Sequence, residues 1–496
     1  MAIRVICTSC RTSFEVKEAF GGKRGKCPMC SEVLVVPPAA APDMAIGLAP
    51  LQAAATEAES LNEEPKPVAK KKLKRPAPER NETELLNTLL QAFDGDVEPV
   101  RTTLGYRFGI VLVTFAMLLL PLIYMALIAG VGYFVYWHAT KNLSHFASMR
   151  NSWILVFAYG GPLVAGVILL FFMIKPLFAP ASHAGSEKVL QPNQEAILYA
   201  FVSRIARAIK APEPRQIEVS CEVNASASLG GLFGKNLTLT LGLPLVAGLN
   251  ARQFAGVVAH ELGHFSQGAG MRFSYIVRTI NFWFVRVVYE RDSWDERLVQ
   301  GATESGRLAP IIWFAMLCVW ATRWVLWVLM IISHLLSCIL LRQMEYDADR
   351  TMARVAGCET FEEIARRLAL WDASSHAIFS LAGSWWFKDR YPDDLPKLIL
   401  SNADRIPKKL HRKIQQSLNK SRTGIFDSHP CLKDRMANVS REATDGIFNF
   451  DEPATVLLSD FTKLTRQATL KFHQSLFGRH VKREQMVAVV DLEDSA

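Results

Sequence analysis

The sequence lacks the usual marks of a secreted protein. Residues 1–11 contain no long apolar segment, so no secretory signal peptide is predicted. The nine cysteines include two Cys-x-x-Cys pairs near the start and no other paired pattern, which argues against a scaffold held together by disulfides. No internal repeat is visible. The length of 496 residues instead predicts two to four folded domains.

A chain-wide excess of positive charge is also missing. The formal net charge is +9, but residues 66–80 alone hold seven basic residues and one acidic residue. The basic character is therefore local and does not indicate a nucleic-acid surface over the whole protein. Hydrophobic residues make up 50% of the chain, and the mean hydropathy of +0.14 is high for a purely soluble protein. These values predict a membrane component.

Two uncharged segments are long enough to cross a bilayer. Phe108–Trp137 and Trp153–Ile174 contain no charged residue, and each exceeds the roughly 20 residues that a spanning helix needs. Aromatic residues lie at their facing ends, as they do at membrane interfaces. Basic residues are more frequent on the outer flanks of the pair than between the two segments, which predicts that both flanks are cytoplasmic. The alternative is two buried helices of a large soluble domain.

The strongest chemical signal is His260-Glu-Leu-Gly-His264, an H-E-x-x-H motif. A spacing of four residues puts both imidazoles on one face of a helix, which is predicted to begin near Ala251 with Asn250 as its N-cap. The two histidines can then take two positions of a tetrahedral Zn²⁺, while Glu261 acts as general base on water. The alternative is a surface helix with two unrelated histidines.

A catalytic zinc ion needs a third protein ligand and an open fourth position. Glu345 and Asp349 lie one helical turn apart and can face the same point on the first helix. Glu345 would be the third ligand. Asp349 would orient His260 or His264 by accepting a hydrogen bond from the ring nitrogen of that histidine that does not bind the metal. Taken alone, such an acidic pair is more often a solvated helix face.

These motifs resemble a known family, the integral-membrane zinc metallopeptidases that include HtpX, the CAAX prenyl endopeptidase type I and the mitochondrial Oma enzyme. The resemblance runs from about residue 195 to residue 439. It rests on four pieces in the same order, which are Asn224-Ala-Ser-Ala, Val258-Ala-His260-Glu-Leu-Gly-His264, Glu345-Tyr-Asp-Ala-Asp349-Arg, and His429-Pro430 followed by Arg435. It implies that Glu345 binds zinc and that His429 and Arg435 face the substrate and the developing oxyanion. Taken alone, His429 and Arg435 would be a His-Pro turn and a surface arginine.

A substrate-binding strand is predicted before the first histidine. The segment Asn224, Ala225 and Ser226 precedes a Gly-Gly turn and a second strand over residues 236–241. A free strand edge here would let an extended substrate pair through its backbone. The alternative is an ordinary edge strand.

The N-terminal cysteines predict a second metal site. Their spacing matches a four-thiolate structural zinc site of the zinc-ribbon type, built on two short hairpins, with the ligands Cys7, Cys10, Cys27 and Cys30. A redox pair is the alternative, but no thioredoxin-like βαβ pattern accompanies the cysteines. The ribbon is basic, so nucleic acid and acidic proteins are both candidate partners.

The predicted fold is mainly α with a small β-sheet: an integral-membrane, zincin-like metallopeptidase preceded by a small β zinc ribbon. Seven parts are predicted, in this order: a zinc ribbon (1–36), a flexible basic linker with a short helix (37–100), a transmembrane helix pair (101–180), a first catalytic part (186–270), a membrane-associated insertion of two helices (271–341), a second catalytic part (342–440) and a C-terminal extension (441–496).

The insertion poses a topological question. Ile311–Leu341 is long enough to span and is interrupted only by Arg323, whereas Phe273–Tyr289 carries two arginines that are costly at mid-bilayer. Since His264 and Glu345 must reach the same zinc ion, the chain between them crosses the bilayer an even number of times. We expect two crossings. A run that folds back near Arg323, or two segments that do not cross, are the alternatives.

The sequence as a whole predicts a membrane-embedded zinc endopeptidase with one catalytic and one structural Zn²⁺. The expected location is the bacterial inner membrane, with the ribbon and the active site in the cytoplasm. The expected partners are the bilayer and unfolded or membrane protein substrates, as in membrane-protein quality control. Two alternatives stay open: a processing protease for one substrate, including a prenylated one, and a non-catalytic membrane adaptor whose zinc ribbon recruits partners.

Overall fold

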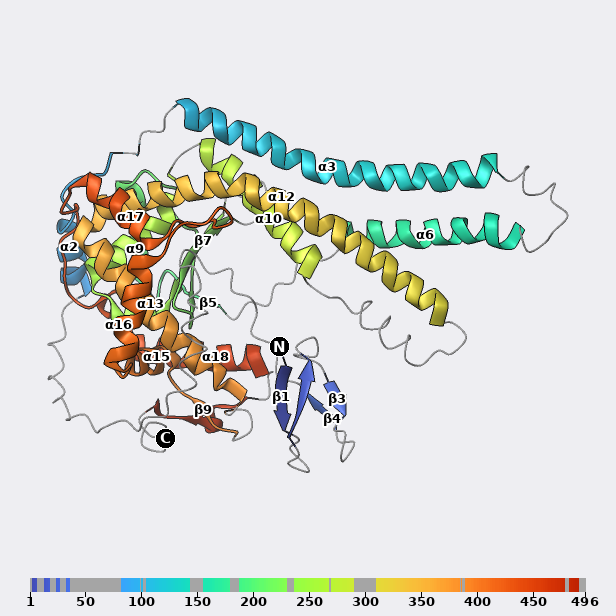
Figure 1. The fold of residues 1–496 in the computed structure, drawn as a ribbon. Coiled ribbons are helices and arrows are strands. Elements are labelled where there is room, and N and C mark those ends of the chain that lie inside the picture. Colours follow the sequence, from blue (N-terminus) through green and yellow to red (C-terminus); the bar gives the residue numbers. More distant parts are fainter. Residues whose placement is uncertain are drawn as a thin grey trace.

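The computed structural model of the chain describes residues 82–489 and four strands at the N-terminus. The residues left out between 82 and 489 are 99, 101–103, 143–154, 179–186, 230–235, 267–268, 290–308, 384, 386–388 and 478–480. Figure 1 shows long helices that lie side by side and project from a compact body made of a sheet and shorter helices. The architecture is mainly helical with small sheets, as the sequence predicts.

The four N-terminal strands form two antiparallel pairs. Strand β1 (Ala2–Ile6) pairs with β2 (Ser13–Lys17), and β3 (Arg24–Lys26) pairs with β4 (Val33–Val35). These are the two hairpins expected for residues 1–36. The four cysteines of the predicted ribbon lie outside the described residues, so the structural zinc site stays a prediction.

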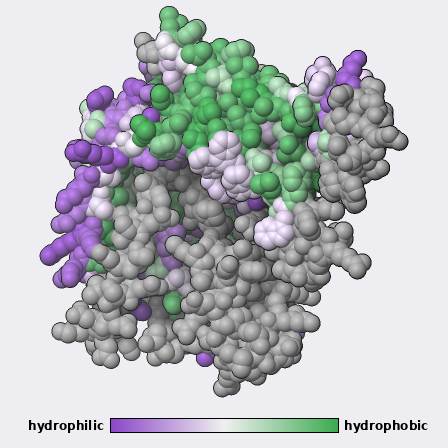
Figure 2. All heavy atoms as spheres, turned by 45° about the vertical axis from the view of Figure 1, so that its right-hand side comes forward, coloured by the Kyte–Doolittle hydropathy of each residue, from purple (hydrophilic) through white to green (hydrophobic). Residues whose placement is uncertain are grey.

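Three helices in the described part of the chain are long and apolar enough to cross a membrane. They are α3 (Leu104–Lys141), the helical segment Ala158–Phe178 that contains α6 (Gly161–Ile174), and Ile312–Ala356 within α12 (Ala309–Ala356). Many of their large apolar side chains face outward, and Figure 2 shows hydrophobic residues gathered over this part of the surface. Such exposed apolar surface fits a membrane protein and disfavours two helices buried in a soluble domain.

Helix α10 (Ala269–Tyr289) covers the predicted marginal segment but is not one of these three helices. It lies beside α3 and α12 and shares a buried apolar cluster with them (Figure 1). Two polar contacts add to this packing, since the Asn281 side chain donates to Ser337 Oγ at 2.7 Å and accepts from Ser333 Oγ at 2.5 Å. The second crossing predicted for this segment stays a prediction.

Helix α12 is continuous for 48 residues. It therefore does not fold back near Arg323, which removes that alternative for the longer run. The domain boundary predicted between residues 341 and 342 falls inside this helix. As a result, one rigid element joins the apolar segment to Glu345 and Asp349.

The compact body is built around a four-stranded sheet in the order β5-β6-β8-β7. Its strands are β5 (Lys188–Val189), β6 (Gln216–Ser220), β7 (Ala225–Leu229) and β8 (Leu237–Gly242). Alternate residues Leu237, Leu239 and Leu241 are buried, as expected for a strand with one face on the core. Strand β8 is parallel to β6 and antiparallel to β7, and β7 lies at the edge of the sheet.

Helices surround this sheet. They are α7 (Ala196–Ala208), α8 (Leu243–Gly248), α9 (Ala251–Gly263), α13 (Cys358–Ser380), α15 (Leu395–Asp404), α16 (Lys408–Lys420), α17 (Leu432–Val439) and α18 (Phe461–Phe477). A short parallel pair, β9 (Tyr391–Pro392) and β10 (Met486–Val487), lies nearer the C-terminus.

Two segments that the sequence treats as peripheral belong to the core. Helix α2 (Glu82–Gln91) is the short helix predicted before Gly95, and its residues Leu85 and Leu89 are buried in the main apolar cluster. Phe448 of the predicted C-terminal extension is fully buried in that cluster, and the centroid of its ring lies 4.4 Å from the ring centroid of Phe93. The described parts of both segments therefore help to hold the body together.

Candidate metal centre

Helix α9 carries His260, and His264 follows directly as the residue that caps its C-terminus. The helix begins after Asn250, whose side chain accepts a hydrogen bond from the Gln253 backbone N–H at 2.7 Å, while the Gln253 side chain accepts one from the Asn250 N–H at 3.2 Å. This reciprocal cap satisfies two N–H groups that a helix start leaves unpaired. The predicted N-cap is confirmed. Every residue of α9 except Arg252 is buried, so the histidines do not lie on a surface helix.

Glycines allow α9 to approach α12 closely. A Cβ on Gly256 would lie 2.9 Å from the Cβ of Ala356 and 3.3 Å from Cγ of Met352. A Cβ on Gly263, two turns later, would lie 3.2 Å from the Cβ of Thr351. Larger residues at these positions would push the helices apart, because close-packed interiors have no room to absorb added atoms. The close approach brings Glu345 of α12 against the histidines.

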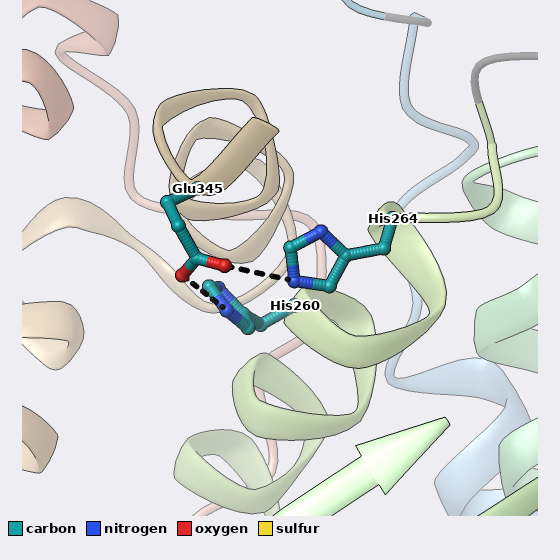
Figure 3. A group of neighbouring side chains, drawn as sticks. All are labelled: His260, His264 and Glu345. Atoms are coloured by element: carbon teal, nitrogen blue, oxygen red, sulfur yellow. Dashed lines mark ion pairs between the residues drawn. The ribbon is translucent and has the colours of Figure 1, made fainter. Parts of the chain in front are cut away.

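The three predicted metal ligands meet at one point (Figure 3). Glu345 Oε2 lies 3.6 Å from His260 Nε2, and Glu345 Oε1 lies 3.5 Å from His264 Nε2. One donor atom from each residue lies within 4.8 Å of the others. Donor atoms at bond lengths of about 2.0–2.1 Å around a tetrahedral ion are about 3.4 Å apart, so these separations suit ligands of a single ion.

Several of these donor atoms lack hydrogen bonds. Within the described part of the chain, both ring nitrogens of His264 and both carboxylate oxygens of Glu345 are buried without a hydrogen-bond partner. An unsatisfied buried polar group costs about 1–3 kcal/mol, and native proteins contain few of them. A divalent cation would satisfy an imidazole nitrogen and a carboxylate at once. The residues present therefore fit a divalent metal ion.

Asp349 connects the histidine to an arginine. Its Oδ1 lies 3.2 Å from His260 Nδ1, on the side of the ring away from Glu345. Arg435 of α17 donates two hydrogen bonds to Asp349, from Nε at 2.8 Å and from Nη2 at 2.6 Å. Asp349 thus lies within reach of His260, and its role in orienting the ring stays a prediction. Arg435 lies behind the histidine, and its predicted contact with the oxyanion stays a prediction.

Burial and neighbouring charges act differently on the two histidines. At His264, burial lowers the pKa well below its ordinary value. At His260, burial also disfavours the charged ring, but the nearby Asp349 and Glu345 carboxylates, which attract the protonated ring and can accept hydrogen bonds from it, outweigh burial and raise the pKa to about 10. The strongly negative surroundings of His260 are a further reason to expect a cation at this point.

Glu261 lies beside the cluster and is 4% exposed. Burial raises its pKa to about 7, while the positive charges of His260, Arg278 and Arg435 oppose this rise and the negative charge of Glu345 supports it. A carboxylate that titrates near neutral pH can both take and return a proton, which is the requirement for a general base.

A mostly apolar pocket opens next to Glu261. Its walls come from the start of β7 and the residues just before it, from α8, α9 and α12, from one face of α13, and from α17. The lining residues are Val223, Asn224, Ala225, Leu245, Val257, His260, Glu261, Met352, Phe361, Ile364, Ala365, Leu368, Asp372 and Arg435.

Of the predicted substrate strand, Asn224 and Ala225 thus reach the site. Gly242 makes this possible, because a Cβ there would lie 2.2 Å from the Glu222 carbonyl oxygen and 2.4 Å from that of Asn224. Ser226 follows in β7 and is not part of the pocket lining. The role of β7 in binding substrate stays a prediction.

His429 contacts Glu345 from the loop before α17. Its Nδ1 lies 3.3 Å from Glu345 Oε1, and its side chain is 26% exposed. The preceding loop is tied to α12, because Arg342 Nη1 donates to the carbonyl oxygens of Gly424 at 2.9 Å and Asp427 at 3.2 Å. His429 is therefore held at the mouth of the site, where it can reach a substrate.

Sequence reasoning missed two contributions to the site. Arg278 of α10 places Nη2 3.8 Å from Glu345 Oε1, although the sequence suggested only that it would be costly in a membrane. A charged residue in an apolar helix is itself a signal of function, and it could have identified Arg278. The pocket wall formed by α13 had no such signal, because its residues have the ordinary spacing of a core helix.

Comparison with known proteins bears on this geometry. Neither the curated proteins nor the solved structures gave a match to the chain. The model of peptidase family M48 matches residues 192–443, slightly more than half of the sequence. The matched span starts just before α7, contains both histidines and Glu345, and ends after α17, so it covers the elements that build the metal centre. The chain therefore belongs to peptidase family M48 and is a metallopeptidase.

Proposed function

We propose that the protein is a membrane-embedded, zinc-dependent endopeptidase that hydrolyses peptide bonds of unfolded or membrane proteins at the cytoplasmic face of the membrane. The observation that carries this proposal is the buried cluster of His260, His264 and Glu345 with Glu261 beside it. Two imidazoles and one carboxylate form a donor set used by catalytic zinc sites, whereas Mg²⁺ and Ca²⁺ prefer oxygen donors.

Peptide hydrolysis follows from the positions of these residues. A bound Zn²⁺ would supply Lewis acidity, which polarises the scissile carbonyl and lowers the pKa of water. Glu261 accepts a proton from the attacking water as the water oxygen bonds to the carbonyl carbon. It then gives that proton to the amine nitrogen as the C–N bond breaks. His429 donates a hydrogen bond to the carbonyl oxygen, and Asp349 keeps His260 oriented.

Two features support an endopeptidase that acts on membrane or unfolded proteins. Strand β7 lies at the edge of its sheet and leads into the metal centre, so an extended chain could pair along it without a free end. Backbone pairing of this kind gives affinity with little sequence preference, which suits unfolded substrates. Three apolar helices would keep the site close to the bilayer, and the basic flanks of the first two favour a cytoplasmic orientation.

The test compares three variants of the full chain with wild type. Glu261→Gln should keep its metal content and lose cleavage of an unfolded protein, because only the proton acceptor is removed. His264→Ala should lose the catalytic metal. Glu213→Gln, at an exposed ion pair with Arg207, is the matched control and should cleave normally.

Three results would count against the proposal. If Glu261→Gln lost its metal as readily as His264→Ala, the assigned roles would be wrong. If metal-loaded wild type cleaved no unfolded or membrane protein, a non-catalytic adaptor would be the better description. Comparing proteomes with and without active enzyme separates quality control from processing of one substrate. If the enzyme processes one substrate, only that protein stays uncleaved when active enzyme is absent.

A further inference from the structure

Helix α10 brings an arginine to the metal centre from the side of the apolar helices. Arg278 Nη2 lies 3.8 Å from Glu345 Oε1, and its side chain is 40% exposed, whereas Glu345 is almost completely buried. The guanidinium therefore lies between the carboxylate and the open side of the site. We propose that Arg278 is a catalytic residue that holds the oxygen of the scissile carbonyl as this oxygen becomes negatively charged. This inference rests on the proposed function.

The position of Arg278 is well defined by packing. One residue earlier, Val277 is fully buried in the cluster that α10 shares with α3 and α12 (Figure 1). Nearly one turn later, Asn281 exchanges hydrogen bonds with Ser333 and Ser337 of α12. These contacts lie on either side of Arg278, so the arginine is held to the same helix that carries Glu345. A group that acts on a transition state needs such a fixed position.

Among the described residues, the only carboxylate within ion-pair distance of Arg278 is that of Glu345, which is also one of the three residues that could hold the metal. Arg435 and Asp349 pair with each other through two hydrogen bonds. A divalent cation at the three ligands would be balanced by the carboxylates of Glu345 and Glu261. The charge of Arg278 then remains in excess, and the distance of 3.8 Å to Glu345 is too long for a hydrogen bond. The negative charge that would balance it appears when water adds to the carbonyl.

The surroundings of α10 agree with a place beside bound substrate. Tyr275, nearly one turn before Arg278, donates from its hydroxyl to the carbonyl oxygen of Leu229 at 3.4 Å. Leu229 ends β7, and the other end of β7 lines the pocket beside Glu261. Helix α10 thus runs from the far end of the edge strand to the metal ligands. An extended chain along β7 would therefore run close to the part of α10 that carries Arg278.

The experiment uses the full chain, loaded with zinc in detergent, and three variants. Arg278→Gln removes the charge, Arg278→Lys keeps it, and Arg207→Gln is a control at an exposed arginine of α7. Two quantities are measured besides metal content: kcat and KM for a fluorogenic peptide, and the affinity for a phosphonate peptide, whose anionic tetrahedral group imitates the oxyanion. Loss of one oxyanion donor lowers kcat by about 10²–10³-fold in enzymes of known mechanism.

We expect Arg278→Gln to lower kcat by about 10²-fold or more, to change KM by less than about threefold, and to weaken phosphonate binding by a similar factor as kcat. Arg278→Lys should recover part of both losses. Metal affinity should stay the same or increase in Arg278→Gln, because a positive charge near the ion has been removed. A merely structural role would instead weaken metal binding.

Unchanged kcat and phosphonate affinity in Arg278→Gln would overturn the inference, and so would loss of the metal in both Arg278 variants. The proposed function fails separately. A wild-type protein that binds the phosphonate through Arg278 but cleaves no peptide would refute peptidase activity and still support this role for Arg278.

Discussion

Two roles are predicted for Asp349, and a pair of variants can separate them. It is fully buried, lies 3.2 Å from His260 Nδ1 and accepts two hydrogen bonds from Arg435. Asp349→Asn keeps the shape and one acceptor oxygen but removes the charge. Loss of a partner that orients a metal-binding histidine weakens metal binding by about 10–100-fold, or about 1.4–2.7 kcal/mol.

The second effect concerns stability. Breaking a buried ion pair by removing one partner costs about 3–5 kcal/mol, because the other charge is left buried and uncompensated. Asn keeps one acceptor oxygen for Arg435, so we expect the free energy of unfolding to fall by an amount near the lower end of that range. The double variant Asp349→Asn/Arg435→Met removes the stranded charge as well. It should regain most of the lost stability without regaining metal affinity.

The assay measures the two effects independently. Thermal unfolding of the metal-free protein in detergent reports stability, and competition with a chromophoric chelator reports metal affinity. Wild-type metal affinity in Asp349→Asn would refute the role of Asp349 in orienting His260. Recovery of metal affinity in the double variant would show instead that the charge of Arg435 alone had weakened the site.

Three further outcomes are expected. Deleting residues 1–36 should release one zinc ion per chain and leave cleavage of a small generic peptide intact, because the flexible linker predicted over residues 37–80 would separate the predicted ribbon from the catalytic body; metal analysis and a peptidase assay check this. Thr303→Cys and His376→Cys are placed one at a time in a protein whose other catalytic-region cysteines have been replaced, and an impermeant thiol reagent is added to intact cells. If the insertion crosses the bilayer twice, the reagent should label position 303 and should not label position 376. Burial lowers the pKa of His473 to about 4, so as the pH falls this histidine takes up a proton in the unfolded chain before it does so in the folded protein. The stability that His473 contributes is fully present above pH about 6.5 and should decline towards pH 4. Thermal scans of His473→Phe should show a smaller decline.

Local patterns were enough to identify the chemistry and its helices. The spacing of His260 and His264 requires only one regular helix, and Asn250 caps it through a residue three positions away. The apolar segments near residues 108 and 311 are helical because a long run with at most one charged residue has few other stable conformations in a membrane. In each case the residues that interact are neighbours in sequence, so the pattern can be recognised without a fold.

Only the tertiary structure showed how distant residues of the site contact one another. Asp349 and Arg435 are 86 residues apart, and either one alone resembles an ordinary charged surface residue. Arg278 reaches Glu345 because α10 and α12 pack against each other, and Phe448 is core because the chain returns to the body after α17. Such contacts are selected by the packing of the whole chain, where burial and charge balance outweigh local preference. No local pattern encodes them, since the same residues would be solvated in any other arrangement.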